Sequence, residues 1–149
     1  MKDCIEFVDF TPLHSRACLA LFDASCPEHF LPHERPEYED YLKNNPEGYQ
    51  VCTLRDDIIG AFGLAAEKEK SLASITWIML SPKHQGVGIG KEMMGQIFEK
   101  AHAQKFKTIQ IATSHKTCSF FAKFQAQAIR NIPNGWGDGM HRVDMIIKL

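Results

Sequence analysis

Apolar and polar positions in the first part of the chain change from the alternation of a strand to the spacing of helices. Residues 4–10, CIEFVDF, alternate and predict a strand. Thr11 and Pro12 supply a helix start signal, and helical spacing then continues to about Ser25. A second, shorter helix is expected in PEYEDYLKNN, residues 36–45, which lies between prolines.

Strands dominate the middle of the chain. Residues 49–54, YQVCTL, and 58–66, IIGAFGLAA, are each typical of a strand, and Asp56 and Asp57 between them predict a hairpin. A third strand is expected over residues 71–80, SLASITWIML, because its second half is β-branched and aromatic. It runs directly into Ser81-Pro82 and a glycine-rich turn.

Helical spacing returns at Ile89 and continues through the following residues. Residues 107–113 then predict a buried strand, 114–124 a short helix, and 141–149 a final strand whose alternate apolar residues share a face. The order of elements predicts an α/β fold with a mixed sheet. The fold has three layers if helices cover both faces of that sheet.

Composition is ordinary for one globular domain spanning residues 1–149. Apolar residues make up 44% of the chain and charged residues 23%, and the formal net charge is −1. Lysines and arginines are scattered, so no basic run indicates a partner that is a nucleic acid or an anionic membrane. A small-molecule partner is therefore expected.

Cysteine usage bears on the compartment. The five cysteines are an odd number and include no CxxC pair. The N-terminal segment MKDCIEFVDF lacks an apolar signal core. No apolar run approaches the roughly 18 residues that a membrane helix needs. We expect reduced thiols and a cytoplasmic location.

Three glycines, Gly86, Gly88 and Gly90, alternate just before the helix that begins near Ile89. A glycine turn at a helix start is typical of phosphate binding. A P-loop would need glycine where Gln85 stands and a hydroxyl where Glu92 stands, so that design fails. The dinucleotide fingerprint also fails, because no third glycine follows three residues after the second in either register.

The remaining pattern is Gln85-x-x-Gly88-x-Gly90, preceded by Leu80-Ser81-Pro82 and followed by a helix. This pattern resembles the signature of the GNAT superfamily of acyl-CoA-dependent N-acyltransferases, and the order of elements over residues 4–149 resembles the family arrangement. The resemblance implies a mixed, mostly antiparallel central sheet of six to seven strands flanked by about four helices. It implies acetyl-CoA as co-substrate and no metal.

The glycine loop suits a pyrophosphate on physical grounds as well. The first amides of a helix have no intrahelical partner, and the helix dipole adds partial positive charge. Several amide bonds to charged oxygens, at roughly 1.5 to 3 kcal/mol each, can hold such a group without magnesium. The candidate residues here are Gln85, Gly86, Val87, Gly88, Ile89, Gly90 and Lys91.

By the same resemblance, the strand ending at Leu80 parts from the strand at 107–113, and the pantetheine arm bonds the main chain near Ile78 and Leu80. Ser114 stands where the family often has an asparagine that contacts this arm, although a helix N-cap is an equal alternative. Phe121 takes the position of the tyrosine that often protonates the leaving thiolate. That proton donor is therefore missing.

A general base is useful because an ordinary amine is almost wholly protonated at neutral pH. Position makes Glu67, His115 and Cys118 the candidate catalytic residues. Each has a plain alternative: a solvated strand end, a surface histidine and a small core residue, respectively. The expected reaction is direct attack of an amine on the thioester, with backbone amides near Ile78 polarising the carbonyl.

Two further segments carry candidate chemistry. Residues 26–34, CPEHFLPHE, combine thiol, imidazole and carboxylate groups, but their spacing matches no standard zinc site, so a loop on the acceptor side is preferred over metal binding. Residues 134–139, NGWGDG, predict a mobile loop before the last strand. In the family such a loop can border the acceptor pocket or a homodimer partner. Trp136 is accordingly a candidate specificity residue, unless it packs over the sheet edge.

These observations predict an N-acetyltransferase that moves an acetyl group from acetyl-CoA to a primary amine of a small molecule or peptide. The alternative is a regulatory module that binds CoA or acyl-CoA without catalysis, because Phe121 replaces a tyrosine and no base is obvious. A nucleotide-binding protein is a third possibility. The acceptor amine cannot be named from sequence.

Overall fold

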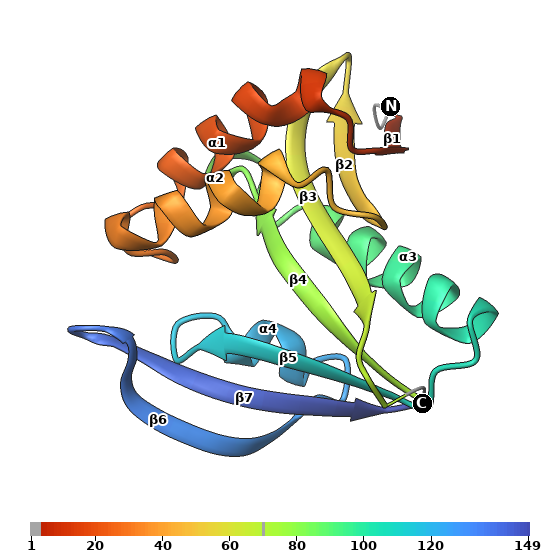
Figure 1. The fold of residues 1–149 in the computed structure, drawn as a ribbon, viewed down its shortest axis with the longest axis vertical. Helices are drawn as coiled ribbons and strands as arrows, with labels where there is room; N and C mark the ends of the chain where they lie inside the picture. The colour runs from red at the N-terminus through yellow and green to blue at the C-terminus, as the bar shows by residue number, and fades with distance from the viewer. Residues whose placement is uncertain (1–3, 70) are drawn as a thin grey trace.

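Seven strands form one sheet in the order β1-β2-β3-β4-β5-β7-β6 in the computed structural model, which describes residues 4–69 and 71–149 (Figure 1). Every neighbouring pair is antiparallel except β4 and β5, which are parallel. The strands are β1 Ile5–Asp9, β2 Tyr49–Leu54, β3 Asp57–Ala66, β4 Leu72–Leu80, β5 Thr108–Ser114, β6 Gln127–Gly137 and β7 Met140–Lys148.

Helices cover both faces of this sheet and make three layers (Figure 1). The helices α1, Ser15–Ala24, and α2, Arg35–Lys43, lie on one face, and α3, Ile89–Ala103, lies on the other with the short helix α4, Cys118–Ala122. Three 3-10 turns precede α1, α2 and α3: η1 Pro12–His14, η2 Pro32–Glu34 and η3 Pro82–His84. The fold class expected from the sequence is confirmed.

Each face has its own apolar core. Met93, Met94 and Ile97 of α3 pack with Ile109 of β5 in one cluster. Phe22 of α1 packs with residues of α2, β2 and β4 in the other, including Tyr38, Tyr49 and Met79. The helical spacing in the sequence therefore corresponds to the buried stripes of α1, α2 and α3.

The pairing of β4 with β5 is short, and this shapes the whole molecule. In the described residues, the register joins only Leu72–Ser74 to Thr108–Gln110. Beyond these residues the two strands diverge like the arms of a V (Figure 1). The parting of these strands was expected from the family resemblance, and the sheet shows it.

Two local expectations can be refined. The hairpin between β2 and β3 forms, and its turn consists of Arg55 and Asp56, which both have positive φ, 51° and 68°. Two left-handed residues match the twist of the flanking strands. The helix expected over residues 114–124 is shorter, because only Cys118–Ala122 is helical.

The expected mobile loop at residues 134–139 is wrong. Asn134 to Gly137 belong to β6, and only Asp138 and Gly139 form the turn to β7. β6 is an edge strand that is exposed along most of its length, so it lacks the apolar alternation that marks a strand. The Asp-Gly pair was the available hairpin signal.

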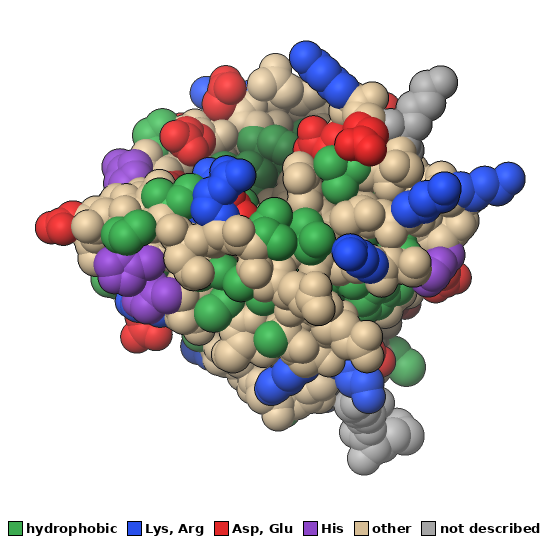
Figure 2. Space-filling view, turned by 90° about the horizontal axis from the view of Figure 1, so that it is seen from below, with side chains coloured by type: hydrophobic (Ala, Val, Ile, Leu, Met, Phe, Trp, Pro, Cys, Tyr) green, Lys and Arg blue, Asp and Glu red, His purple; other side chains and the backbone are tan. Residues whose placement is uncertain are grey.

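Neither a membrane-spanning helix in the described residues nor a large basic patch on the face shown in Figure 2 is found. No helix within residues 4–69 and 71–149 is long and apolar enough to cross a membrane. On the face shown in Figure 2, lysine and arginine side chains are dispersed among acidic and uncharged ones. This face therefore presents no continuous basic surface for a polyanion.

Candidate functional site

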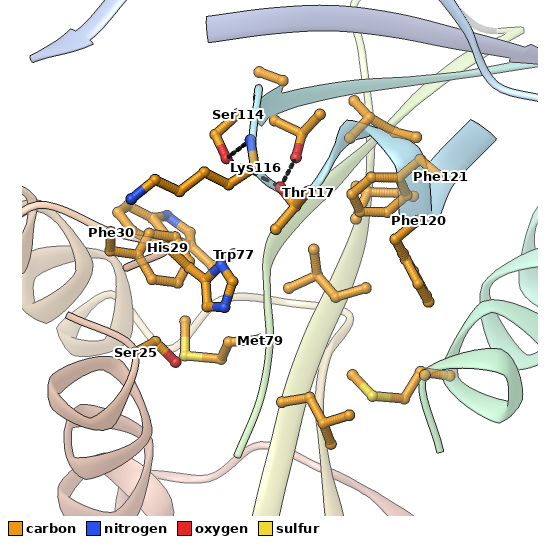
Figure 3. A pocket seen from close by; sticks show the side chains of 18 of the residues that line it. Ser25, His29, Phe30, Trp77, Met79, Ser114, Lys116, Thr117, Phe120 and Phe121 are labelled. Carbon is orange, nitrogen blue, oxygen red and sulfur yellow. Dashed lines mark hydrogen bonds between the residues drawn. The ribbon is translucent and has the colours of Figure 1, made fainter. Parts of the chain in front are cut away.

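A cavity of about 1000 Å³ opens where β4 and β5 part. Its walls are residues 75–80 of β4 and 111–114 of β5. The glycine turn before α3 and the helix α4 close one end, and residues from the loop between α1 and α2 line the other (Figure 3). The cavity thus joins the glycine turn and the loop at residues 26–34, which the sequence analysis considered separately.

Main-chain groups of β4 are available to this cavity. β4 pairs with β3 along its length, but among the described residues only Leu72–Ser74 pairs with β5. The edge from Ile75 to Leu80 therefore faces the gap without a strand partner. On the opposite wall, the Trp136 indole Nε1 donates a hydrogen bond of 2.8 Å to the carbonyl of Thr113. An extended ligand can complete the pairing that the sheet lacks.

β4 contains a bulge at the centre of this wall. Ala61 pairs with Met79 and Gly63 with Thr76, so Trp77 and Ile78 together oppose one residue of β3. Trp77 has a φ of 37°, which is rare for a bulky residue. Bulges are common beside active sites, where they redirect backbone groups. The amide region near Ile78, expected to polarise the carbonyl, therefore lies in a distorted part of the strand.

Buried hydroxyl groups hold this bulge from behind. Tyr49 donates a 2.7 Å hydrogen bond to the carbonyl of Trp77, and its hydroxyl also lies 2.8 Å from that of Tyr38. The hydroxyl of Tyr41 lies 3.0 Å from Thr76 Oγ1. Burial raises the pKa of Tyr49 and Tyr38, so both hydroxyls remain protonated. These bonds fix the bulge from the α2 side.

The glycines of the turn serve two different purposes. Gly86 and Gly88 have φ values of 81° and 90°, and Gly88 is the N-cap of α3. A Cβ at Gly90 would instead lie 3.0 Å from the ring of Phe120. Gly86 and Gly88 thus meet a backbone requirement, while Gly90 allows α3 to pack against α4. A purely phosphate-based explanation for all three glycines was incomplete.

Most residues expected to contact the co-substrate line the cavity. These are Ile78, Leu80, Gln85, Gly86, Gly88, Gly90, Lys91, Ser114 and Phe121. Val87 and Ile89 do not. The Val87 side chain is 58% exposed, whereas Ile89 is buried in the core beneath α3. Only their backbone groups belong to the turn.

Ser114 and Phe121 lie together on the β5 and α4 side of the cavity (Figure 3). Ser114 Oγ accepts a hydrogen bond of 3.2 Å from the amide of Lys116, and Thr117 is the N-cap residue of α4. The alternative role of Ser114 as a helix N-cap is therefore wrong. Phe121 is buried and packs edge-on against Phe120.

The three candidate bases do not line the cavity. Glu67 follows β3 at the closed end of the V, where it accepts hydrogen bonds from Ser74 and Gln110. The ring of His115 lies against that of His141, with 4.7 Å between centroids. Cys118 directs its thiol to the carbonyl of His115 at 3.6 Å. Glu67 lies at the other end of β4, whereas His115 and Cys118 are next to lining residues but their side chains are directed elsewhere.

Other titratable side chains occupy the end of the cavity away from the glycine turn. The loop between α1 and α2 contributes His29 and Glu34, α2 contributes Glu37 and Tyr41, and the turn after β5 contributes Lys116. The sequence predicted that this loop lies on the acceptor side, but neither His29 nor Glu34 was selected as a site residue. The polar composition of this loop and its two prolines were the sequence features that indicated a role for it, and they do not show which side chains point inward.

Glu34 has a structural task at this end. Its Oε2 accepts a 2.8 Å hydrogen bond from the amide of Leu31, and the residue is only 6% exposed. Burial raises the pKa of the Glu34 carboxyl, and the bond to Leu31 opposes part of that rise. Within the described residues, no group of three His, Cys, Asp or Glu side chains could hold a metal ion.

The β6–β7 hairpin reaches this same end. Trp136 lines the cavity, and the Arg142 guanidinium lies 5.0 Å from its ring centroid. A Cβ at Gly137 would overlap Leu31 and lie 2.7 Å from His33 Cε1, so the hairpin touches the loop between α1 and α2. The two arms of the V are therefore bridged over the end that holds His29.

A family comparison assigns this architecture. The model of the Acetyltransferase (GNAT) family matches residues 16–125, which is most of the chain. The chain belongs to this family. The match includes β4, the glycine turn, α3 and α4, which are the elements that surround the cavity. The chain is accordingly an acetyltransferase of the GNAT type, with the fold that the signature at Gln85 to Gly90 implied.

Solved structures share this GNAT fold at low sequence identity. Ard1 from Thermoplasma volcanium matches with a TM-score of 0.82, 15% identity and 97% of each chain covered. An N-acetyltransferase from Staphylococcus aureus Mu50 gives 0.75 and 12%, over 97% of this chain and 98% of that one. An aminoglycoside 6'-N-acetyltransferase complexed with coenzyme A gives 0.76 and 12%, over 97% and 96%. At these identities the likeness concerns the fold.

Proposed function

We propose that the protein transfers an acetyl group from acetyl-CoA to a primary amine of a small molecule or peptide by direct attack. The observation that supports this most strongly is the cavity between β4 and β5, which connects the unpaired edge of β4 to the glycine turn. One end suits a pyrophosphate and the wall suits an extended arm. The other end has room and polar groups for an acceptor.

The chain's own groups would hold acetyl-CoA in three places. Amides from Gly86 to Gly90 are placed at the N-terminus of α3, where a pyrophosphate gains from the helix dipole. The main chain near Ile78 and Leu80 offers hydrogen bonds to the pantetheine arm. Bound acetyl-CoA supplies the activated acetyl thioester, and an amide donor near Ile78 in the bulge would polarise its carbonyl.

The acceptor would enter at the end that His29, Tyr41 and Trp136 line. The contact of Gly137 with the loop between α1 and α2 covers this end, which favours a small molecule or a narrow peptide terminus. The dispersed charge in Figure 2 gives no support for a polyanionic partner. The five free thiols fit a reducing location, and we propose the cytoplasm.

The test is thermal stability of the wild type and Gly88→Asp in the presence of acetyl-CoA, CoA, ATP or NAD. At 100 times the dissociation constant, a ligand stabilises by about 2.7 kcal/mol. We expect acetyl-CoA and CoA to stabilise the wild type and to lose this effect in Gly88→Asp, because a carboxylate would occupy the phosphate position. Aspartate adopts positive φ more readily than most residues, so the variant should fold, with some loss of stability.

Gly139→Asp is the matched control. Gly139 has a similar φ of 78° and open space around its Cβ position, but it does not line the cavity. This variant should keep the full stabilisation by CoA. If CoA species do not stabilise the wild type, or if they bind without acetyl transfer to any amine in a broad panel, the proposed function is wrong.

A further inference from the structure

One imidazole at the acceptor end has no assigned partner. His29 lines the cavity and is half-buried, and its Nδ1 is buried without a hydrogen-bond partner among the described residues. Figure 3 shows the ring projecting into this end of the cavity, near Phe30 and the bulge residue Trp77. A buried nitrogen without a hydrogen-bond partner costs free energy. We therefore expect a bound ligand to supply the partner of His29 Nδ1.

His29 also lines the same cavity as the bulge of β4. The bulge at Trp77 and Ile78 lies on the stretch of β4 that lines the cavity, where the proposed function places the thioester carbonyl. Aromatic rings surround this point: the centroid of Trp77 lies 6.0 Å from that of Phe30 and 6.3 Å from that of Tyr41. An amine that approaches this carbonyl through the acceptor end enters the part of the cavity that His29 lines.

The other titratable groups at this end suit proton removal less well. Glu34 uses Oε2 to accept the Leu31 amide, and Glu37 is exposed at the rim. Burial raises the pKa of the Tyr41 hydroxyl, which is therefore protonated and cannot accept a proton from an amine. Lys116 has no acceptor when charged. An imidazole can both accept and release a proton near neutral pH.

We infer that His29 is the proton acceptor for the amine in the reaction proposed above, on which this inference rests. The bound ammonium first passes one proton to an imidazole nitrogen of His29, and the neutral nitrogen then forms its bond to the thioester carbon. The carbon–sulfur bond then breaks, and the electron pair leaves with the CoA sulfur as thiolate. The nitrogen that becomes the amide gives its second proton to the thiolate, and the imidazolium gives the first to solvent, so the products are the amide, CoA and one proton.

Charge around His29 comes from several elements. Glu34 and Glu37 face this end from η2 and α2, Tyr41 faces it from α2, and Lys116 reaches over it from the turn after β5 (Figure 3). Ser25, just after the last residue of α1, and Trp77 of β4 also line this end and do not titrate. The two carboxylates favour a positively charged amine here, and the imidazole must be neutral to act as a base.

The experiment compares wild type, His29→Gln and His29→Ala in acetyl transfer to the best amine of the panel, across pH. Glutamine keeps a hydrogen-bonding group but cannot take the proton. We expect kcat of His29→Gln to fall by about 100-fold or more. Its activity should begin only at higher pH, where the amine itself loses its proton. Added imidazole should restore part of the activity of His29→Ala.

Controls separate this inference from folding and from the proposed function. His29→Gln should keep the stabilisation by CoA, because His29 lies away from the glycine turn. His102→Gln makes the same change on the exposed side of α3 and should behave as wild type. If the wild type transfers acetyl groups and His29→Gln keeps its kcat and pH profile, the inference is wrong while the function stands. A pH profile moved by Glu34→Gln, and not by His29→Gln, would also overturn it.

Discussion

Single side chains decide how closely the elements around the cavity approach one another. Gly90 and Gly95 both lie in α3, where a glycine weakens the helix unless it has a further role. In the structure, a Cβ at Gly90 would meet the ring of Phe120 at 3.0 Å, whereas one at Gly95 would have open space. One glycine is therefore required by packing across the cavity wall, and the other only weakens the helix.

Alanine at these two positions should consequently have opposite effects. Gly95→Ala should raise the free energy of unfolding by about 1 kcal/mol, the usual helix preference of alanine over glycine. Gly90→Ala must displace Phe120, and overpacking of this kind costs roughly 1 to 3 kcal/mol. Urea denaturation of both variants measures the difference. Equal stability of the two would show that Phe120 moves freely.

The strand β4 combines regular pairing, a bulge and an unpaired edge within nine residues. Its bulge holds Trp77 at a φ that bulky residues rarely adopt, and such strain persists only where the surroundings fix it. The hydroxyl of Tyr49, which bonds the Trp77 carbonyl, is the contact best placed to do so. The geometry of the site thus depends on a residue that does not line it.

Tyr49→Phe should therefore lower the free energy of unfolding by about 1 to 3 kcal/mol, because it removes the hydroxyl that bonds the buried Trp77 carbonyl and that lies beside the Tyr38 hydroxyl. Tyr41→Phe is the control. It removes a half-buried bond to Thr76 and should cost roughly 0.5 to 1.5 kcal/mol. Urea denaturation compares the two. A Tyr49→Phe protein as stable as the wild type would mean that the bulge needs no such support.

The elements could be predicted well from sequence where one face is buried. The apolar stripes of α1 and α3 and the β2–β3 hairpin could be predicted, and Gln85, Gly88 and Gly90 marked the end of the cavity formed by the glycine turn. The edge strand β6 was missed because exposure on both faces removes its pattern. The pair Asp138-Gly139 is typical of a hairpin turn and was the signal that a strand precedes β7.

The end of the cavity that holds His29 could not be predicted, because it depends on strand direction and on loop placement. Glu67 follows β3, which runs antiparallel to β4, so it lies at the start of β4, whereas the glycine turn lies at the end. A strand of nine residues separates them by roughly 30 Å. His29 lies on an irregular loop between two helices, where no periodicity indicates which side chains point inward.

At the scale of the whole molecule, two cores meet along a sheet, and both contain buried thiols. Cys18 belongs to the core beneath α1, and Cys52 belongs to the core beneath α3. Burial raises the pKa of each thiol to about 11, with a smaller opposing contribution from Tyr38 at Cys18 and a further rise from Glu92 at Cys52. Folding therefore holds both protons more tightly than the unfolded chain does.

The free energy of unfolding should then decrease as pH rises from about 9 towards 11. In this window the unfolded thiols, with ordinary pKa values near 9.0, release protons that the folded ones retain. Urea denaturation between pH 8 and 10.5 measures the slope. The decrease of the free energy of unfolding with pH should be shallower in the double variant Cys18→Ala/Cys52→Ala. It should be unchanged in Cys4→Ser, since Cys4 is exposed. An unaltered slope in the double variant would contradict the assignment.

The parting of β4 from β5 also has a consequence for the solubility of the protein. A strand with unpaired main-chain groups normally lies at the rim of a sheet, where it can recruit another chain and start aggregation. Here the unpaired stretch from Ile75 to Leu80 lies in the interior of the sheet order, facing the second arm of the V. The walls of the cavity shield this stretch from a strand of another protein, while the cavity leaves room for a slender, flexible molecule.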